Sequence, residues 1–239
     1  MHHTTKTYIK PTMRLSDLIF ENPALLLLLE HFDIETLTRD KTVAQICDDR
    51  QLNPDVFIVL ANLYNGFYPS GVEKFGEQDA LSFILFLRNS HLFYLNEKIP
   101  EVQSLINELY KKNEQKKIKL IEDFFNEYAN EVREHLAYED DIAFPYFNAL
   151  IRNSGITNNE QDKFSVQVYR DHHGDIETKL ADLKNLLLRF ISLKEDRPVQ
   201  RKLLLSLFEL ESDLNIHSII EEQLLMPLIK KIERKHSIE

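Results

Sequence analysis

Apolar residues recur at helical spacing from about residue 79 to the end of the chain. Hydrophobic positions three or four residues apart lie on one face of an α-helix, so each such stripe predicts a helix with one buried face. The four stripes are Leu81, Ile84, Leu85, Leu92 and Leu95; Ile118, Ile121, Phe124, Phe125, Tyr128, Val132 and Leu136; Phe164, Val168, Ile176, Leu180, Leu183 and Leu187; and Leu203, Leu207, Leu210, Leu214 and Ile220. The breaks between them fall near 100–113, 153–159 and 194–198. Four long helices with three short connections predict an all-α, up-down-up-down four-helix bundle.

Glycine placement separates this bundle from a shorter N-terminal segment. Three of the five glycines fall within 65–78, together with Pro69 and Ser70, and such a stretch is typical of a linker. Short helices are expected before it, because Asn22-Pro23 and Asn53-Pro54 each resemble an N-cap followed by proline, and 42–49 is helical in pattern. We therefore predict a small helical domain at 1–65, a linker at 66–78 and the bundle at 79–239.

Composition excludes several classes of protein. The chain of 239 residues is 43% hydrophobic, which is enough to bury a core, and its net charge of −10 argues against general binding of nucleic acid. A single cysteine rules out an intrachain disulfide and is typical of a reducing compartment. No apolar run is long enough to span a membrane, and the N-terminus lacks the apolar core of a signal peptide. These features predict a cytoplasmic protein.

Four of the nine histidines are regularly spaced. The distance from His91 to His135 is 135 − 91 = 44 residues, and the distance from His173 to His217 is 217 − 173 = 44 residues. The two pairs are themselves offset by 173 − 91 = 82 residues. This regularity indicates an internal duplication of a helix pair, in which each helix carries one inward-facing histidine.

The second histidine of each pair lies in a repeated frame. In both copies a glutamate follows the histidine by four residues and a proline follows the glutamate by six; the copies are His135, Glu139 and Pro145, and His217, Glu221 and Pro227. Residues four apart share a helix face, so each helix offers an imidazole and a carboxylate to the same point. The single spacing is weak, but the repeated frame with its constant offset is specific.

Four imidazoles and two carboxylates exceed the needs of a four-coordinate zinc site. Two carboxylates can bridge two metal ions, so the predicted ligands are His91, His135, Glu139, His173, His217 and Glu221. A solvent-derived oxo or hydroxo bridge would leave one octahedral position open, which is typical of non-haem iron. The ferritin type of site needs a glutamate three residues before each histidine, and that motif is absent. The competing interpretation is four satisfied core histidines, which the shared register disfavours.

Neighbouring residues leave some choices open. His172 is adjacent to His173 and is an alternative ligand, although Arg88 and Arg170, each three residues before a histidine, favour His173 as the equivalent of His91. Glu131 and Asp213 each precede a candidate ligand by four residues. They either orient imidazole N–H groups or belong to solvated faces.

The segment 79–239 resembles the haemerythrin-like di-iron bundles, and most closely the repair-of-iron-centres (RIC) proteins. The matching stretches are the two frames from His135 to Pro145 and from His217 to Pro227, together with His91 and 171–173. The N-terminal segment is similar to the small domain that precedes the bundle in that family, over 32–34 and 41–47. Where that domain usually carries adjacent cysteines, this chain has 35–38, Glu-Thr-Leu-Thr.

The resemblance implies two non-haem iron ions, oxo- or hydroxo-bridged, with NO or O2 as a small ligand and iron–sulphur proteins as clients. The implied role is repair or protection of iron–sulphur clusters under nitrosative or oxidative stress. The alternative is a haemerythrin-like sensor or scavenger of O2 or NO, which the missing cysteine pair favours. A third reading is a purely structural helical protein, and metal content distinguishes it from both.

Overall fold

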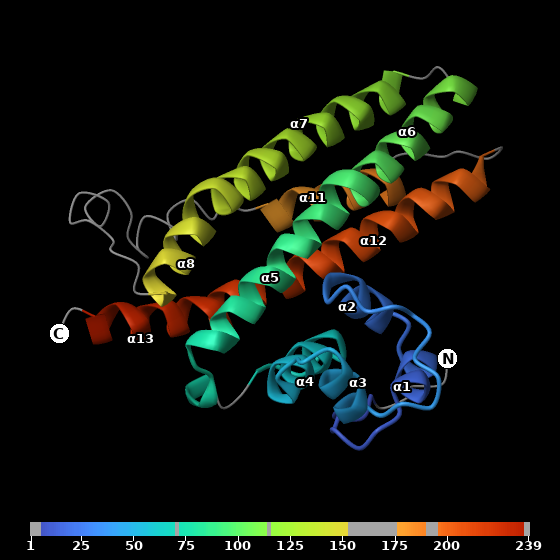
Figure 1. The fold of residues 1–239 in the computed structure, drawn as a ribbon. Coiled ribbons are helices and arrows are strands. Elements are labelled where there is room, and N and C mark those ends of the chain that lie inside the picture. Colours follow the sequence, from blue (N-terminus) through green and yellow to red (C-terminus); the bar gives the residue numbers. More distant parts are fainter. Residues whose placement is uncertain (1–5, 70–71, 114–115, 153–175, 190–195, 237–239) are drawn as a thin grey trace. The chain divides into compact units, whose positions relative to one another are not determined.

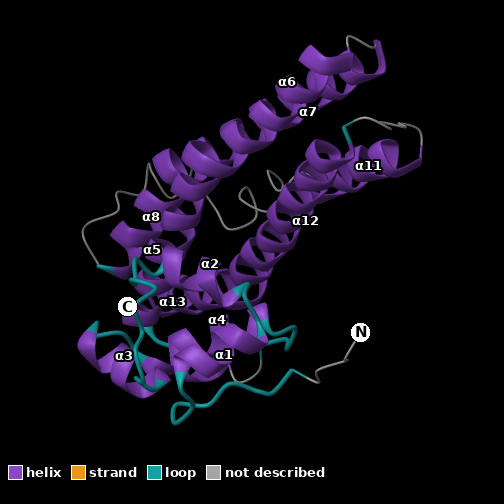
Figure 2. Ribbon diagram, turned by 90° about the vertical axis from the view of Figure 1, so that its right-hand side faces the viewer, coloured by secondary structure: helices purple, strands orange, loops and turns teal. Residues whose placement is uncertain are grey.

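The computed structural model describes residues 6–69, 72–113, 116–152, 176–189 and 196–236. Over these residues the chain is helical and has no strand, apart from an isolated bridge between Arg14 and Thr42 (Figures 1 and 2). The predicted all-α class is therefore confirmed. Among the described helices, none is both long and apolar enough to cross a membrane.

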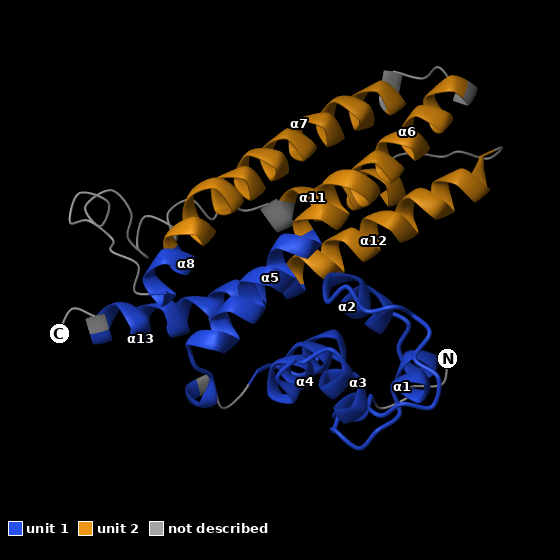
Figure 3. Ribbon diagram, in the orientation of Figure 1, with its two compact units in different colours: residues 1–90, 147–155, 216–239 blue, residues 91–146, 156–215 orange. Residues whose placement is uncertain are grey.

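The chain divides into two compact units (Figure 3). Unit 1 comprises residues 1–90, 147–155 and 216–239, and unit 2 comprises residues 91–146 and 156–215. This division follows contacts in space, and the division at 65 and 78 expected from glycine placement stays a prediction. Two helices contribute residues to both units, α5 (Glu77–Phe93) and α12 (Arg197–Ile219).

Unit 1 contains the short helices of the N-terminal segment. These are α1 (Leu15–Glu21), α2 (Leu25–His31), α3 (Val43–Asp49), α4 (Pro54–Tyr64) and the 3-10 turn η1 (Val72–Lys74). The predicted start of α3 is confirmed, because the Thr42 hydroxyl accepts from the Gln45 N–H and the Gln45 side chain accepts in return. The predicted start of α4 is also confirmed, with Asn53 as its N-cap and proline at the first position.

The prediction for Asn22 was wrong. Asn22 ends α1 and does not begin a helix at Pro23, because α2 starts only at Leu25. Its side chain is buried and donates to the Tyr64 carbonyl at 2.9 Å and to Asn65 Oδ1 at 2.7 Å. An asparagine engaged in this way ties α1 to the end of α4, and the cap signal in the sequence does not distinguish the two uses.

Unit 2 contains a four-helix core. Its helices are α6 (Ile99–Asn113), α7 (Lys116–Tyr138), α11 (Ile176–Arg189) and α12, and all four supply buried apolar residues to one cluster. The stripes predicted on α7 and α12 lie in or against this cluster, from Ile118 to Leu136 and from Leu203 to Leu214. The predicted bundle is thus confirmed in unit 2. Phe164 and Val168 of the third stripe lie outside the described residues.

The stripe predicted on α5 was partly wrong. Leu85 and Leu92 are 59% and 58% exposed, although both were expected in the core. The buried face of α5 carries Phe83, Leu87 and the fully buried His91. A search for apolar periodicity passes over a face on which polar residues alternate with apolar ones, and so selects the wrong side of the helix.

The helix break predicted at Pro100 was also wrong, because a π-turn carries the helix past the proline. The π-turns η2 (Tyr94–Lys98), η3 (Glu139–Ala143) and η4 (Ile220–Leu225) lead without interruption into α6, α8 (Phe144–Ile151) and α13 (Met226–His236). In each, the residue before a proline donates to the carbonyl five residues back: Ile99 to Tyr94, Phe144 to Glu139, and Met226 to Glu221. Proline lacks an N–H and crowds the carbonyl four residues earlier, and a wider turn relieves both problems.

Candidate metal centre

Unit 2 holds three of the predicted ligands at one point. The Nε2 atom of His91, on α5, lies 3.2 Å from Glu139 Oε2, and the Nε2 atom of His135, on α7, lies 3.2 Å from Glu139 Oε1. The His91 and Glu139 side chains are fully buried, and that of His135 is 12% exposed. Each carboxylate oxygen therefore faces a different imidazole, which is the arrangement that a bridging carboxylate requires.

Unit 1 holds the second copy of the frame. His217 Nε2, near the end of α12, lies 3.3 Å from Glu221 Oε1, on η4, and both side chains are buried. The spacing of four residues produces this pair as it produces the pair of His135 and Glu139. In each copy the glutamate is also the residue whose backbone carbonyl accepts the π-type hydrogen bond.

The chemistry of these donors fits a cation. Burying a carboxylate is unfavourable unless a positive charge compensates it. An imidazole nitrogen and a carboxylate oxygen about 3 Å apart meet that need in two ways, by a proton on the imidazole or by a metal ion that both atoms bind. Glu139 groups with His91 and with His135 as potential ion ligands. Mixed imidazole and carboxylate donors are a set that iron accepts.

The outer nitrogen of each buried imidazole also has a partner. His91 Nδ1 lies 3.0 Å from Asp140 Oδ2, and the ring of His91 stacks on Phe144 with centroids 5.5 Å apart. His217 Nδ1 lies 3.0 Å from the hydroxyl of Ser90. Sequence analysis missed Asp140 and Ser90 because neither stands at a helical spacing from the histidine that it contacts.

Glu131 and Asp213, two candidates for orienting the imidazoles, differ in the structure. Glu131 pairs with Lys179 on α11 and is partly exposed. Asp213 is 1% exposed and accepts a hydrogen bond of 2.7 Å from the hydroxyl of the fully buried Tyr94. The predicted ligand His173 and its alternative His172 lie outside the described residues.

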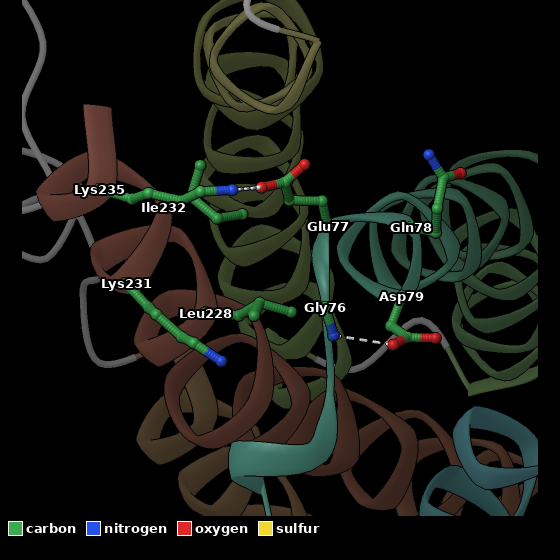
Figure 4. A pocket seen from close by; sticks show the side chains of 8 residues that line it. All are labelled: Gly76, Glu77, Gln78, Asp79, Leu228, Lys231, Ile232 and Lys235. Carbon is green, nitrogen blue, oxygen red and sulfur yellow. Dashed lines mark hydrogen bonds and ion pairs between the residues drawn. The ribbon is translucent and has the colours of Figure 1, made fainter. Parts of the chain in front are cut away.

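A separate pocket in unit 1 contains no histidine. It has a volume of about 570 Å³ and lies between the start of α5 and α13, with Leu228 and Ile232 as its apolar wall (Figure 4). Lys235 forms an ion pair of 3.0 Å with Glu77 at its edge, and the Gly76 N–H donates to Asp79 at 2.8 Å. The donor set of this pocket is thus unlike that of the buried histidines and glutamates.

The buried set of imidazoles and carboxylates on helices of a bundle agrees with a comparison to known families. Residues 100–201 match the Hemerythrin HHE cation binding domain. The chain therefore contains a haemerythrin-type domain, and that domain implies binding of a metal cation, typically iron. The matched stretch includes His135 and Glu139. No curated protein matches the chain.

Proposed function

We propose that this protein holds two non-haem iron ions with His91, His135, Glu139, His173, His217 and Glu221. The observation that carries the proposal is the geometry of Glu139, whose two buried oxygens each face an imidazole nitrogen at 3.2 Å. The repeated frame supports the same role for Glu221 beside His217. The constant offset of 82 residues supports His173 as the remaining ligand.

The chain's own residues supply binding and protection from solvent. Fully buried carboxylates and imidazoles favour a cation because no water competes for them. When bound, iron would supply a redox-active Lewis acid with room for a small ligand. The apolar residues around the ligands, such as Phe144 beside His91, admit small uncharged molecules more readily than ions.

The role that we infer is repair or protection of iron–sulphur clusters in the cytoplasm under nitrosative or oxidative stress. Donation of iron or chemistry with NO or O2 would serve this role. The resemblance to RIC proteins in both frames supports it. Iron–sulphur proteins are then the clients.

A second candidate is a sensor or scavenger that binds O2 or NO reversibly. The state of Cys47 favours it. This is the chain's single cysteine, its side chain is fully buried, and burial raises the pKa of its thiol to about 11. A thiol in that state is a poor nucleophile at neutral pH, so the N-terminal segment is poorly suited to thiol chemistry.

Metal content tests the site. We expect close to two iron ions per chain after anaerobic loading with Fe²⁺ and removal of excess metal. Glu139→Gln and Glu221→Gln should each lower this number, because each removes a charge that a bridging ligand needs. Glu222→Gln is the matched control, since it makes the same change at the adjacent exposed position. Wild-type protein that retains no iron would contradict the proposal.

Activity then distinguishes the two roles. The iron-loaded protein is incubated with an iron–sulphur dehydratase whose cluster has been damaged by NO, and recovery of dehydratase activity is followed. Recovery that Glu139→Gln abolishes favours cluster repair. A reversible optical change with O2 or NO, without recovery of the dehydratase, favours the sensor or scavenger.

A further inference from the structure

The hydrogen bonds around Ser90 fix which nitrogen of His217 carries a proton. The Ser90 hydroxyl donates to the Leu87 carbonyl at 2.7 Å, and its oxygen lies 3.0 Å from His217 Nδ1. A hydroxyl has one proton to donate, and here that proton is directed at Leu87. The oxygen can therefore only accept from His217, so Nδ1 carries a proton and Nε2 is the nitrogen that faces Glu221.

Asp140 has the same effect on His91. A carboxylate oxygen accepts hydrogen bonds and does not donate them, so His91 Nδ1, 3.0 Å from Asp140 Oδ2, carries a proton. His91 Nε2 is then the nitrogen that faces Glu139. Stacking on Phe144 at an interplanar angle of 20° holds the ring in this orientation.

The π-turn η3 accounts for the position of Asp140. Glu139 and Asp140 are consecutive, yet their carboxylates reach opposite nitrogens of one imidazole. A π-turn distributes more residues around each turn than an α-helix does, so neighbouring side chains diverge less. The turn that follows from Pro145 thus directs a second carboxylate toward the same ring as Glu139.

We propose that Ser90 and Asp140 are positioning residues for the metal centre. Each holds a ligand imidazole with Nδ1 protonated and Nε2 directed to the ion, before any ion is bound. This inference rests on the proposed function and adds two residues that touch no ion. Partners of this kind typically change metal affinity by about 10- to 100-fold. Asp140, as an anion, also makes its imidazole a stronger donor, whereas Ser90 is neutral.

Equilibrium binding of Fe²⁺ tests the proposal. Anaerobic competition with a coloured chelator gives the affinity of wild type, Ser90→Ala, Asp140→Asn and Asp140→Ala. We expect affinity to fall about 10- to 100-fold in Ser90→Ala and Asp140→Ala. We expect a smaller loss in Asp140→Asn, which keeps an acceptor oxygen. Asp140 is partly exposed, with 28% of its side chain accessible, so its replacement leaves the core packing intact.

Two control variants make the same chemical changes elsewhere. Ser82→Ala removes a hydroxyl from α5 whose partner is the Gln78 carbonyl, and Asp141→Asn removes a charge from the exposed neighbour of Asp140. Both should bind Fe²⁺ within about twofold of wild type, an energy difference smaller than one ordinary hydrogen bond. Equal losses in the control and test variants would overturn the proposal.

Nuclear magnetic resonance of the metal-free protein gives a second readout. Long-range ¹H–¹⁵N spectra show which ring nitrogens carry protons. We expect a protonated Nδ1 for both His91 and His217 in wild type, and loss of this preference for His217 in Ser90→Ala. An unprotonated Nδ1 on His217 in wild type would overturn the proposal.

The outcomes separate this inference from the proposed function. If wild type binds no iron, the proposed function fails, and the positioning role fails with it. If wild type binds two iron ions and the Ser90 and Asp140 variants bind them equally well, only the positioning role fails. Weaker binding in the test variants alone, with Nδ1 protonated in the metal-free wild type, supports both.

Discussion

Removal of the Tyr94 hydroxyl should destabilise unit 2 measurably. Tyr94 is fully buried in the four-helix core, and its hydroxyl donates to Asp213 at 2.7 Å, where the aspartate is 1% exposed. In Tyr94→Phe a buried carboxylate loses a donor that water cannot replace. Hydrogen bonds to charged groups contribute about 1.5–3 kcal/mol, so we expect the free energy of unfolding to fall by that amount. For a chain of this size the midpoint temperature should fall by about 3–12 °C.

The assay is urea and thermal unfolding of the metal-free protein, followed by circular dichroism in the presence of a chelator. Tyr110→Phe is the control, because it deletes the same atom from a tyrosine on α6 that is 37% exposed. The control should change the free energy of unfolding by no more than about 0.5 kcal/mol.

A double-mutant cycle identifies the partner. In an Asp213→Asn background the carboxylate charge is absent, so Tyr94→Phe should cost less there than in wild type, with a coupling energy of about 1 kcal/mol or more. Equal destabilisation by Tyr94→Phe and Tyr110→Phe, or the absence of coupling with Asp213, would refute the reasoning.

Further predictions concern the proline, the cysteine, a buried lysine and iron itself. Pro145→Ala supplies the missing N–H and should allow η3 to rewind as an α-helix, which would weaken Fe²⁺ binding in the chelator assay while helix content stays unchanged; unaltered affinity would refute this. Because burial raises the pKa of Cys47 to about 11 from 9.0, its reaction with a thiol reagent at pH 8 should be about 100-fold slower in the native protein than in urea; equal rates would mean that the thiol is accessible. Burial lowers the pKa of Lys98, but hydrogen bonds to Glu101 and Glu209 outweigh it and the net shift is upward. The stability that Lys98 contributes should therefore be complete below pH 10.5 and be lost as the pH rises through its higher folded pKa, so wild type should lose stability more steeply than Lys98→Met above that pH; parallel curves would contradict this. Fe²⁺ at 100 times its dissociation constant should raise the free energy of unfolding by about 2.7 kcal/mol per site, measured by urea titration with and without metal; no increase would argue against binding to the folded state.

Predictions from the sequence succeeded where one helix determines the geometry by itself. The stripes of α7 and α12 are strongly apolar on one face, and burial of that face is the main driving force for packing. The contacts of His135 with Glu139 and of His217 with Glu221 follow from a spacing of four residues alone.

Other features depend on how helices meet, and the sequence does not encode that in any short pattern. The contact between His91 and Glu139 requires α5 and η3 to be in a particular register. Ser90 and Leu87, on the buried side of α5, could not be found by apolar periodicity, because this face mixes polar and apolar residues. The break expected at Pro100 failed because the usual penalty for proline in a helix is relieved when the preceding turn widens.

The π-turns have a consequence for the history of the chain. The turn at 139–143 and the turn at 220–225 lie 82 residues apart, which is also the offset between His135 and His217. If the two halves arose by duplication of one gene segment, the single-copy ancestor already carried the widened turn and its proline. Two such short chains would have associated as a symmetric dimer, with each chain contributing one glutamate. The later fusion freed the two halves to diverge, and Ser90 and Asp140 record that divergence, because the residues 82 positions further along are His172 and Glu222.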